Sequence, residues 1–422
     1  MTISILVIFI LGYLAIAFEQ PLKLNKAAIA LITGVLCWVV YIFFNIDKRA
    51  VNEQLLLHLG EISSILFFLL SAMVIVELID AHDGFEIISE QIQTTKIRNL
   101  LWIVCIITFF LSSILDNLTT TIVMISLLRK LVTDSKNRLL FAGMVVIAAN
   151  AGGAWSPIGD VTTTMLWIGG QISPFKIVSS LFLPSLVCLI IPLMIMSFKF
   201  KGALNPIIIH KEKQILSSTP TQRKVVFFVG LGCLIFVPIF KFITDLPPVM
   251  GILLGLGIMW VITEIIHHEK DTPDKNHLSV AGALSKIDAS SILFFLGILL
   301  AISAMESTGI LQSMAVSLTK ITSSDSIIVM LLGLLSAVVD NIPLVASAQG
   351  MYTLEQFSTD HYFWEFLAYC TGVGGSTLII GSAAGVAAMG LEKIDFIWYL
   401  KNISLLSLLG FFAGAGVYII MN

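Results

Sequence analysis

The chain has 422 residues, of which 57% are hydrophobic and only 12% are charged. Soluble domains carry about 25% charged residues, so this composition excludes a soluble enzyme and places the chain in a lipid bilayer. The net charge of −3 and the absence of a long basic tract exclude a nucleic-acid-binding protein, because phosphate contacts need clustered Lys and Arg.

Eight apolar stretches are long enough to cross a membrane, since a spanning helix takes about 20 residues. In chain order they are 2–17, 26–44, 62–79, 177–198, 225–243, 249–266, 289–305 and 396–420. The first stretch ends in Ala15-Ile16-Ala17, which resembles a signal-peptidase site, but no basic residue precedes it. We therefore expect this segment to be retained as a span.

Four further apolar stretches are interrupted by Asp, Asn, Gly, Ser, Thr or Pro; they are 98–132, 139–170, 325–356 and 362–391. Non-helical backbone at membrane depth is tolerated only where protein or a wet cavity satisfies the freed polar groups. The sequence therefore predicts two hairpins, 98–132 and 325–356, and two broken helices, 139–170 and 362–391, around such a cavity.

An internal repeat accounts for these interruptions. Segment Ser63–Leu69 recurs letter for letter as Ser290–Leu296, 227 positions later. Two further motifs recur after 224 and 222 positions: Ser112-x-x-x-Asp116-Asn117 as Ser336-x-x-x-Asp340-Asn341, and Gly152-Gly153-x5-Gly159 as Gly374-Gly375-x5-Gly381. Three matches in one order and at nearly one offset indicate two halves of an ancestral unit, joined by the polar linker 199–224.

Charge predicts how the halves are oriented. Basic residues dominate both flanks of 98–132: Lys96, Arg98, Arg129, Lys130, Lys136 and Arg138 stand against Asp134. Because Lys and Arg mark cytoplasmic segments, both ends lie inside and the stretch is a re-entrant hairpin with Asp116-Asn117 at its tip. The linker 199–224 is also basic. Following the spans from it gives each half five crossings and one hairpin, so the halves are inverted and both termini lie outside.

Three aspartates lie at bilayer depth, where an ionised carboxylate is costly unless it is paired, solvated or protonated. They are Asp116, Asp160 and Asp340. Asp116 lies in the polar run Ser112–Thr121, whose carboxylate, amide and hydroxyl oxygens suit a small hard cation. The alternative is that Asp116 only caps the returning helix. Its recurrence at Asp340 favours the functional interpretation.

The second polar cluster is Asn150–Thr164, which holds three glycines and Pro157 inside an apolar span. These residues unwind the helix and turn carbonyl groups toward a cavity, where Asp160 adds charge and Thr162 or Thr163 adds a hydroxyl. In the repeat, Ser382 stands where the first half has Asp160. The predicted cation site is therefore weighted to the first half.

Other polar residues give weaker signals. Glu77 and Glu306 lie near the ends of corresponding spans, and both a gating role and a simple interfacial position stay open. We expect His82, beside Asp80 and Asp83, to be a solvated loop histidine rather than a pH sensor. An intramembrane aspartyl protease is excluded, because Pro157 stands where its G-x-G-D motif needs the first glycine.

The motifs Ser112–Thr121, Asn150–Thr164 and Ser336–Ser347 resemble those of NhaD-type sodium/proton antiporters, in the superfamily of arsenite and dicarboxylate carriers. The resemblance runs through essentially the whole chain. It implies that ion or proton is bound by Asp116, Asn117, Thr119, Asn150, Asp160, Thr162, Thr163, Asp340 and Asn341. Within this set, Na+ itself is expected at Asp116, Asn117, Asp160 and Thr162. The supporting residues are Ser112, Ser156, Ser336, Ser376, Thr377 and Ser382.

The resemblance also implies a homodimer in the cell (inner) membrane. A scaffold, 1–95 and 225–320, would support a transport domain, 96–198 and 321–422, that slides as an elevator. No cofactor is expected beyond the transported Na+ or Li+ and H+. Cytoplasmic cations would exchange for external protons at shared aspartates, since burial raises carboxyl pKa values. The alternative is a sodium-coupled anion symporter, for example of a dicarboxylate, or an arsenite carrier, although aspartates at the tips would repel an anion.

Overall fold

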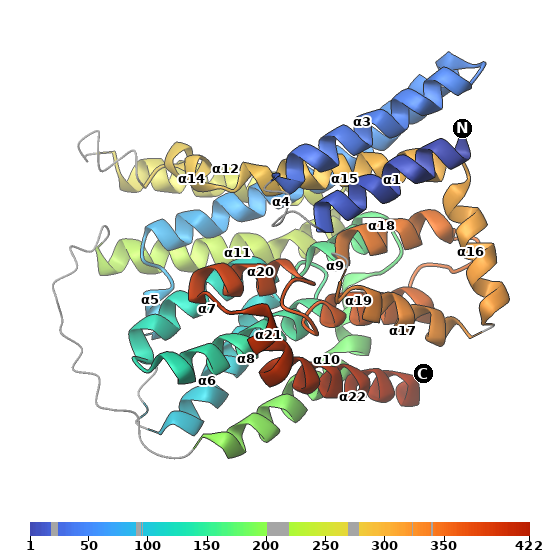
Figure 1. The fold of residues 1–422 in the computed structure, drawn as a ribbon. Helices are drawn as coiled ribbons and strands as arrows, with labels where there is room; N and C mark the ends of the chain where they lie inside the picture. The colour runs from blue at the N-terminus through green and yellow to red at the C-terminus, as the bar shows by residue number, and fades with distance from the viewer. Residues whose placement is uncertain are drawn as a thin grey trace.

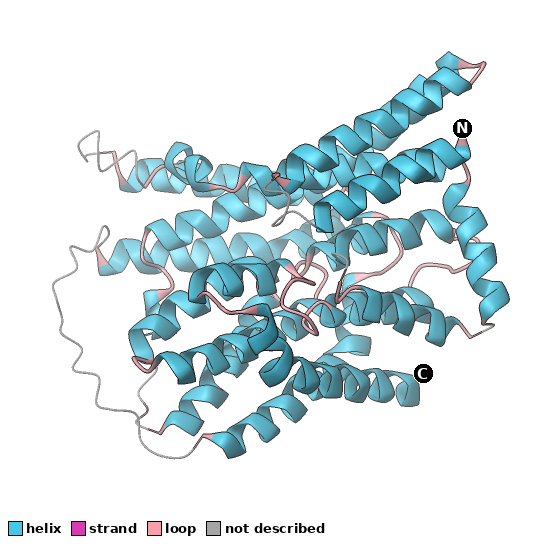
Figure 2. Ribbon diagram, in the orientation of Figure 1, coloured by secondary structure: helices cyan, strands magenta, loops and turns pink. Residues whose placement is uncertain are grey.

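The computed structural model describes residues 1–17, 24–89, 94, 96–200, 219–268, 278–322, 324–338 and 341–422. The regular elements in these ranges are helices (Figure 2). The first half holds α1 (Thr2–Ala17), α3 (Lys26–Phe44), α4 (Lys48–Ala81), α5 (Glu86–Ser89), α6 (Ile97–Ser112), α7 (Asn117–Leu131), α8 (Ser135–Ala154), α9 (Val161–Ile168) and α10 (Pro174–Lys199).

The second half has a corresponding series of helices. It holds α11 (Pro220–Thr244), α12 (Pro248–Ile266), α14 (Val280–Lys286), α15 (Ala289–Ser307), α16 (Ile310–Ile321), α17 (Asp325–Leu335), α18 (Asn341–Met351), α19 (Tyr362–Gly374), α20 (Ala383–Glu392), α21 (Phe396–Tyr399), the π-helical turn η1 (Leu400–Ser404) and α22 (Leu405–Met421). In the described part of the chain, seven helical segments are long and apolar enough to span a membrane. The chain is an integral, multi-pass membrane protein.

Each of the eight predicted spans is helical, but 2–17 forms the shorter helix α1, which is not among the seven long segments, and 396–420 comprises α21, η1 and α22. Helix α4 is longer than predicted: it covers 34 residues instead of 62–79. Its added turns are rich in Lys, Arg, Glu and Gln, which form helix well but lower the local hydropathy. Asp47 caps the new start by accepting hydrogen bonds from the backbone N–H groups of Arg49 and Ala50. In Figure 1 this end of α4 projects with α3 beyond the other helices.

The four interrupted stretches each form two helices separated by a break, as predicted. The breaks separate α6 from α7, α8 from α9, α17 from α18, and α19 from α20. In Figure 2 the loops at these breaks gather near the centre of the molecule. Freed backbone groups are thus brought together at one place, where they can surround a polar cavity.

Glycine is required where the breaks pack against their neighbours. A Cβ on Gly152 would lie 2.2 Å from the carbonyl oxygen of Phe109, and one on Gly374 would lie 2.0 Å from that of Gly333. Serine hydroxyls reinforce the same crossings: Ser112 Oγ donates to the Ala149 carbonyl at 2.6 Å, and Ser336 Oγ donates to the Thr371 carbonyl at 2.8 Å. Equivalent contacts therefore recur in the two halves.

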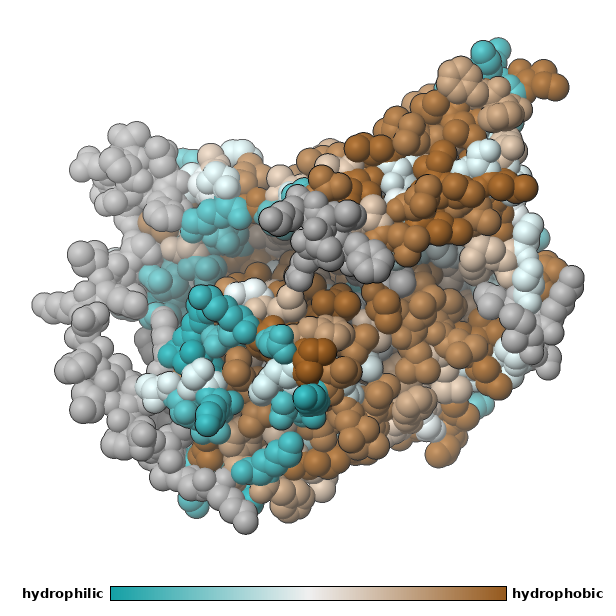
Figure 3. Space-filling model, in the orientation of Figure 1, coloured by the Kyte–Doolittle hydropathy of each residue, from teal (hydrophilic) through white to brown (hydrophobic). Residues whose placement is uncertain are grey.

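Two groups of helices meet along the central breaks (Figure 1). In the first group α3 packs on α1 and α15, and α4 packs on α11 and α12. The second group contains α6–α10 and α17–α22. Apolar side chains cover much of the visible face in Figure 3, while hydrophilic residues gather near α5, α7 and α20. This distribution is typical of a helix bundle that is surrounded by lipid and has a polar surface at one end.

Candidate functional site

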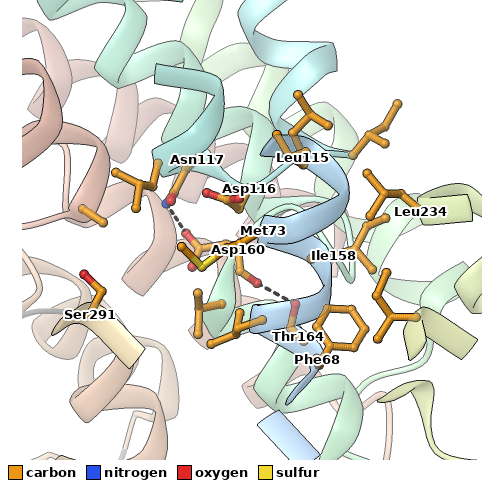
Figure 4. Close-up of a pocket in the computed structure, with 18 of the residues that line it drawn as sticks. Phe68, Met73, Leu115, Asp116, Asn117, Ile158, Asp160, Thr164, Leu234 and Ser291 are labelled. Carbon is orange, nitrogen blue, oxygen red and sulfur yellow. Dashed lines mark hydrogen bonds between the residues drawn. The ribbon is translucent and has the colours of Figure 1, made fainter. Parts of the chain in front are cut away.

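A cavity of about 60 Å³ lies where the breaks meet the first helix group (Figure 4). The breaks contribute most of its polar residues, including Asp116, Asn117, Asp160 and Asn341. The opposite wall comes from α4, α11, α12 and α15 and is apolar except for Ser291; it includes Phe68, Met73, Leu234, Val237, Ile252 and Phe295. Since one water needs about 10–15 Å³ of such space, the cavity has room for a small, partly hydrated ion.

Asp160 is the central side chain of this site and is only 2% exposed. Asn117 Nδ2 donates to its Oδ2 at 2.7 Å, and both the backbone N–H and the hydroxyl of Thr162 donate to its Oδ1 at 3.0 Å. Asn341 Nδ2 lies 3.3 Å from both carboxylate oxygens. These donors are uncharged, so they orient the carboxylate without cancelling its charge.

A chain of polar side chains joins the two halves behind Asp160. Asn117 Nδ2 also donates to Asn150 Oδ1 at 3.0 Å, and Asn150 Nδ2 donates to Ser382 Oγ at 2.9 Å. Asp160 and Ser382 cap α9 and α20 with nearly the same backbone angles: φ and ψ are −143° and 149° in one, −144° and 154° in the other. Equivalent positions therefore have equivalent geometry, but only Asp160 carries a charge.

Asp116 lines the same cavity and also caps α7. Its Oδ1 accepts the Thr119 backbone N–H at 2.8 Å, and its Oδ2 accepts the Thr119 hydroxyl at 2.7 Å. The capping role that the sequence left open is therefore present. It does not exclude an ionic role, because a capping carboxylate retains its charge and further lone pairs.

The remaining predicted residues lie around the breaks rather than on the Asp160 carboxylate. Asp340 lies outside the described residues. Thr163 Oγ1 donates to the backbone carbonyl of Asp160 at 2.9 Å, and Ser376 Oγ donates to that of Val373 at 2.6 Å. Ser156 Oγ accepts the Ile158 N–H at 3.4 Å, and Thr377 is buried beside Ser376 in the second break. Together with Ser112 and Ser336, these hydroxyl residues lie at the breaks and mostly bond to their backbone.

The prediction that His82 is solvated is wrong. It is fully buried, and its Nε2 lies 2.7 Å from the Nε2 of His267, which follows the end of α12. Its Nδ1 lies 2.7 Å from the Leu78 carbonyl. Neighbouring acidic residues suggested exposure, but the partner is 185 positions away in the sequence. Glu77, left open earlier, forms an ion pair with Lys286 at 2.9 Å.

Sequence reasoning missed the apolar wall of the cavity, although a signal for it existed. Phe68 and Phe295 occupy the same position in the literally repeated segments, 227 residues apart, and both line the cavity. Ser291, from the same repeat, lines it as well. The repeated seven-residue segments thus lie on the two helices, α4 and α15, whose faces line the cavity opposite the breaks.

Comparison with known proteins gives consistent matches. The citrate transporter family (CitMHS) matches residues 5–374. Sodium/proton antiporter 1 of Arabidopsis thaliana is 49% identical over 425 residues, covering 100% of this chain and 72% of that protein. Sodium/proton antiporter 2 of the same plant is 46% identical over 98% of both chains. The Na+/H+ antiporter NhaD of Alkalimonas amylolytica is 30% identical over 98% of this chain and 89% of its own.

Proposed function

Because the chain belongs to the citrate transporter family, and there to the NhaD-type sodium/proton antiporters, we propose that it exchanges cytoplasmic Na+ or Li+ for external H+. It is a transporter and not an enzyme. The observation that carries the proposal is the buried Asp160 carboxylate, which uncharged donors hold beside a cavity that also contains Asp116. Such a carboxylate can bind a cation when ionised and a proton otherwise.

The proposed mechanism is competition at this carboxylate. In the structure, Asn117 and Asn341 turn their N–H groups toward Asp160. A bound Na+ needs oxygen ligands, so entry of the ion would rotate these amides and present their oxygens instead. Protonation of Asp160 would remove the negative charge and release the ion. The two cargoes then exclude each other, which is the condition for exchange rather than cotransport.

An anion symporter is the less favoured alternative. Among the described residues that line the cavity there is neither Lys nor Arg, whereas two carboxylates face it. A dicarboxylate would meet charge repulsion and would find mainly apolar side chains on the opposite wall. Neither feature would disfavour a small cation.

We further propose that the halves are inverted repeats and that α6–α7 and α17–α18 are re-entrant hairpins. The recurring Gly152 and Gly374 crossings support the repeat, and the basic flanks of α6–α7 support a cytoplasmic origin for the first hairpin. The boundary between the helix groups fits a scaffold, 1–95 and 225–320, and a sliding transport domain, 96–198 and 321–422. The assembly is proposed to be a homodimer in the cell (inner) membrane, with both termini outside.

The exchange can be tested in everted membrane vesicles from a host that lacks its own antiporters. Respiration establishes a proton gradient, and NaCl or LiCl is then added. We expect rapid collapse of the gradient with either salt, and none with an impermeant organic cation carrying the same anion. Absence of any response between pH 6 and 9.5, together with sodium-dependent uptake of a labelled dicarboxylate, would reject the antiporter and support the symporter.

A further inference from the structure

A lysine and a tryptophan meet across the boundary between the two helix groups. Lys241 of α11 places its Nζ 5.6 Å from the ring centroid of Trp167 of α9. Trp167 is 1% exposed, and α9 is the half-helix that begins next to Asp160. An ammonium group over an indole face is attracted by the ring quadrupole, most strongly where water is excluded. This contact therefore ties the helix that leaves the site to the opposing helix group.

The pair lies one turn beyond the ion cavity on both helices. Val237 and Thr164 line the cavity, and Lys241 and Trp167 follow them by four and three residues. Residues three or four apart share one helix face, so each member of the pair continues a face that lines the cavity. Both lie toward the C-terminal ends of their helices. The contact therefore lies just beyond the end of the cavity that faces these helix ends.

A second contact secures the same boundary elsewhere. Gln312 Nε2 of α16 donates to the carbonyl of Gly350, near the end of α18, at 3.0 Å. A Cβ on Gly350 would approach the Leu311 side chain to 2.5 Å, so α18 is closely packed there. By the charge-based orientation, the C-terminal ends of α9, α11 and α18 all point outward. Both contacts, Lys241 with Trp167 and Gln312 with Gly350, therefore lie toward the side that the orientation makes external.

We propose that Lys241 and Trp167 form the external gate of the ion cavity. The proposal rests on the proposed function for its orientation and for the charge of the cargo. The gate acts in two ways: the contact holds α9 against α11, and the fixed ammonium repels a cation that would leave along this route. Pro238 lies within α11 between Val237 and Lys241, and a proline removes one helix hydrogen bond. The last turns of α11 can therefore bend away when the gate opens.

Sided labelling tests the gate without requiring transport. Met73 lines the cavity from α4, so Met73→Cys places a thiol in it. A membrane-impermeant maleimide is then added to right-side-out or everted vesicles, and both rates are measured. We expect slow external labelling with the gate intact. Lys241→Met and Trp167→Leu should each raise the external rate several-fold, up to about tenfold, the range expected for loss of a partly buried cation–π contact.

Matched variants separate the gate from general damage. Lys241→Arg and Trp167→Phe keep a cation and a ring and should label externally as slowly as the parent protein. Lys224→Met removes a lysine from the other end of α11, where it is exposed, and should also leave the rate unchanged. The five native cysteines are all buried, so labelling of variants that lack Met73→Cys reports unfolding. Should Lys241→Met unfold, Lys241→Gln takes its place.

The outcomes distinguish the gate from the function. External labelling that stays within about twofold of the parent in both the lysine and the tryptophan variants would overturn the gate, because loss of a partly buried cation–π contact predicts more. Raised external labelling in a protein that shows no sodium/proton exchange would support the gate and reject the proposed function. Sodium/proton exchange in a protein whose external labelling is unchanged by the lysine and tryptophan substitutions would support the proposed function and reject the gate.

Discussion

Asp160 accepts hydrogen bonds on both carboxylate oxygens, from Thr162 on Oδ1 and from Asn117 on Oδ2. Asp160→Asn keeps the size of the residue and its ability to cap α9, so the protein should insert and fold. It removes the charge that compensates a cation for lost hydration, and removing one partner from a buried pair costs about 3–5 kcal/mol. We expect exchange to fall at least ~100-fold. The measurement is gradient collapse by NaCl in everted vesicles at equal protein levels.

The matched control for Asp160→Asn is Glu355→Gln, which removes an acidic charge from an exposed loop. It should exchange normally. Near-normal exchange in Asp160→Asn itself would exclude the carboxylate as the shared binding group and leave it a structural role at the start of α9.

Asp116 needs a different substitution, because the structure shows that it caps a helix as well as lining the cavity. Serine caps a helix about as well as aspartate but carries no charge. If the charge binds the cargo, Asp116→Ser and Asp116→Asn should both abolish exchange while the protein remains inserted. Thr119→Val, which removes the hydroxyl donor but leaves the charge, should only weaken exchange several-fold. Normal exchange in Asp116→Ser would identify Asp116 as a helix cap alone.

At the residue scale, the sequence predicted which residues form the site but not the direction in which each side chain points. Asn117, Asp160 and Thr162 were predicted from their types and depth, and Asn150 from the family resemblance. The structure connects all four by hydrogen bonds. Thr163 was predicted with Thr162, yet its hydroxyl bonds the backbone. Adjacent residues on a helix point about 100° apart, so a motif can identify the cluster but not which hydroxyl faces inward.

At the scale of elements, the breaks depend on helices that cross almost in backbone contact. Gly152→Ala would place a methyl group 2.2 Å from the Phe109 carbonyl oxygen. Because this oxygen belongs to the backbone of α6, the clash can be relieved only if α6 shifts. Overpacking of this kind costs about 1–3 kcal/mol. We expect Gly152→Ala to lower the Tm of the detergent-solubilised protein by several degrees, measured by loss of monodisperse protein on heating.

Gly390→Ala is the control for this prediction, because a Cβ at Gly390 meets nothing within 4 Å. Alanine is also the better helix former, so Gly390→Ala should leave the Tm unchanged or raise it. Equal midpoints for the two variants would show that the α6 and α8 crossing adjusts without cost, and the glycine motif would then need another explanation.

The helices themselves were largely predictable, since long apolar runs and their polar interruptions follow directly from burial in lipid. The first turns of α4 were not, because hydropathy detects only the segment within the membrane. Pairings between distant elements were also beyond the sequence. Asn150 with Ser382, and His82 with His267, are joined across 232 and 185 positions, and local patterns carry no information about such partners.

At the scale of the whole molecule, Asp116 and Asp160 line one cavity between the two helix groups, and we expect ion and proton to share it. A cation held at the Asp160 carboxylate would repel a second positive charge at the same group. A proton bound at the aspartate must then leave before Na+ can bind. Lowering the pH raises the protonated fraction, so it should raise the apparent KM for Na+, by up to about tenfold per pH unit once the site is mostly protonated. At saturating Na+ the maximal rate should be unchanged by this competition.

The competition can be measured as the initial rate of gradient collapse against Na+ concentration at several pH values in everted vesicles. A KM that rises with acidification at constant maximal rate would fit one site used alternately. A maximal rate that falls with acidification while KM stays constant would contradict competition, because protons would then act at a place that Na+ does not occupy.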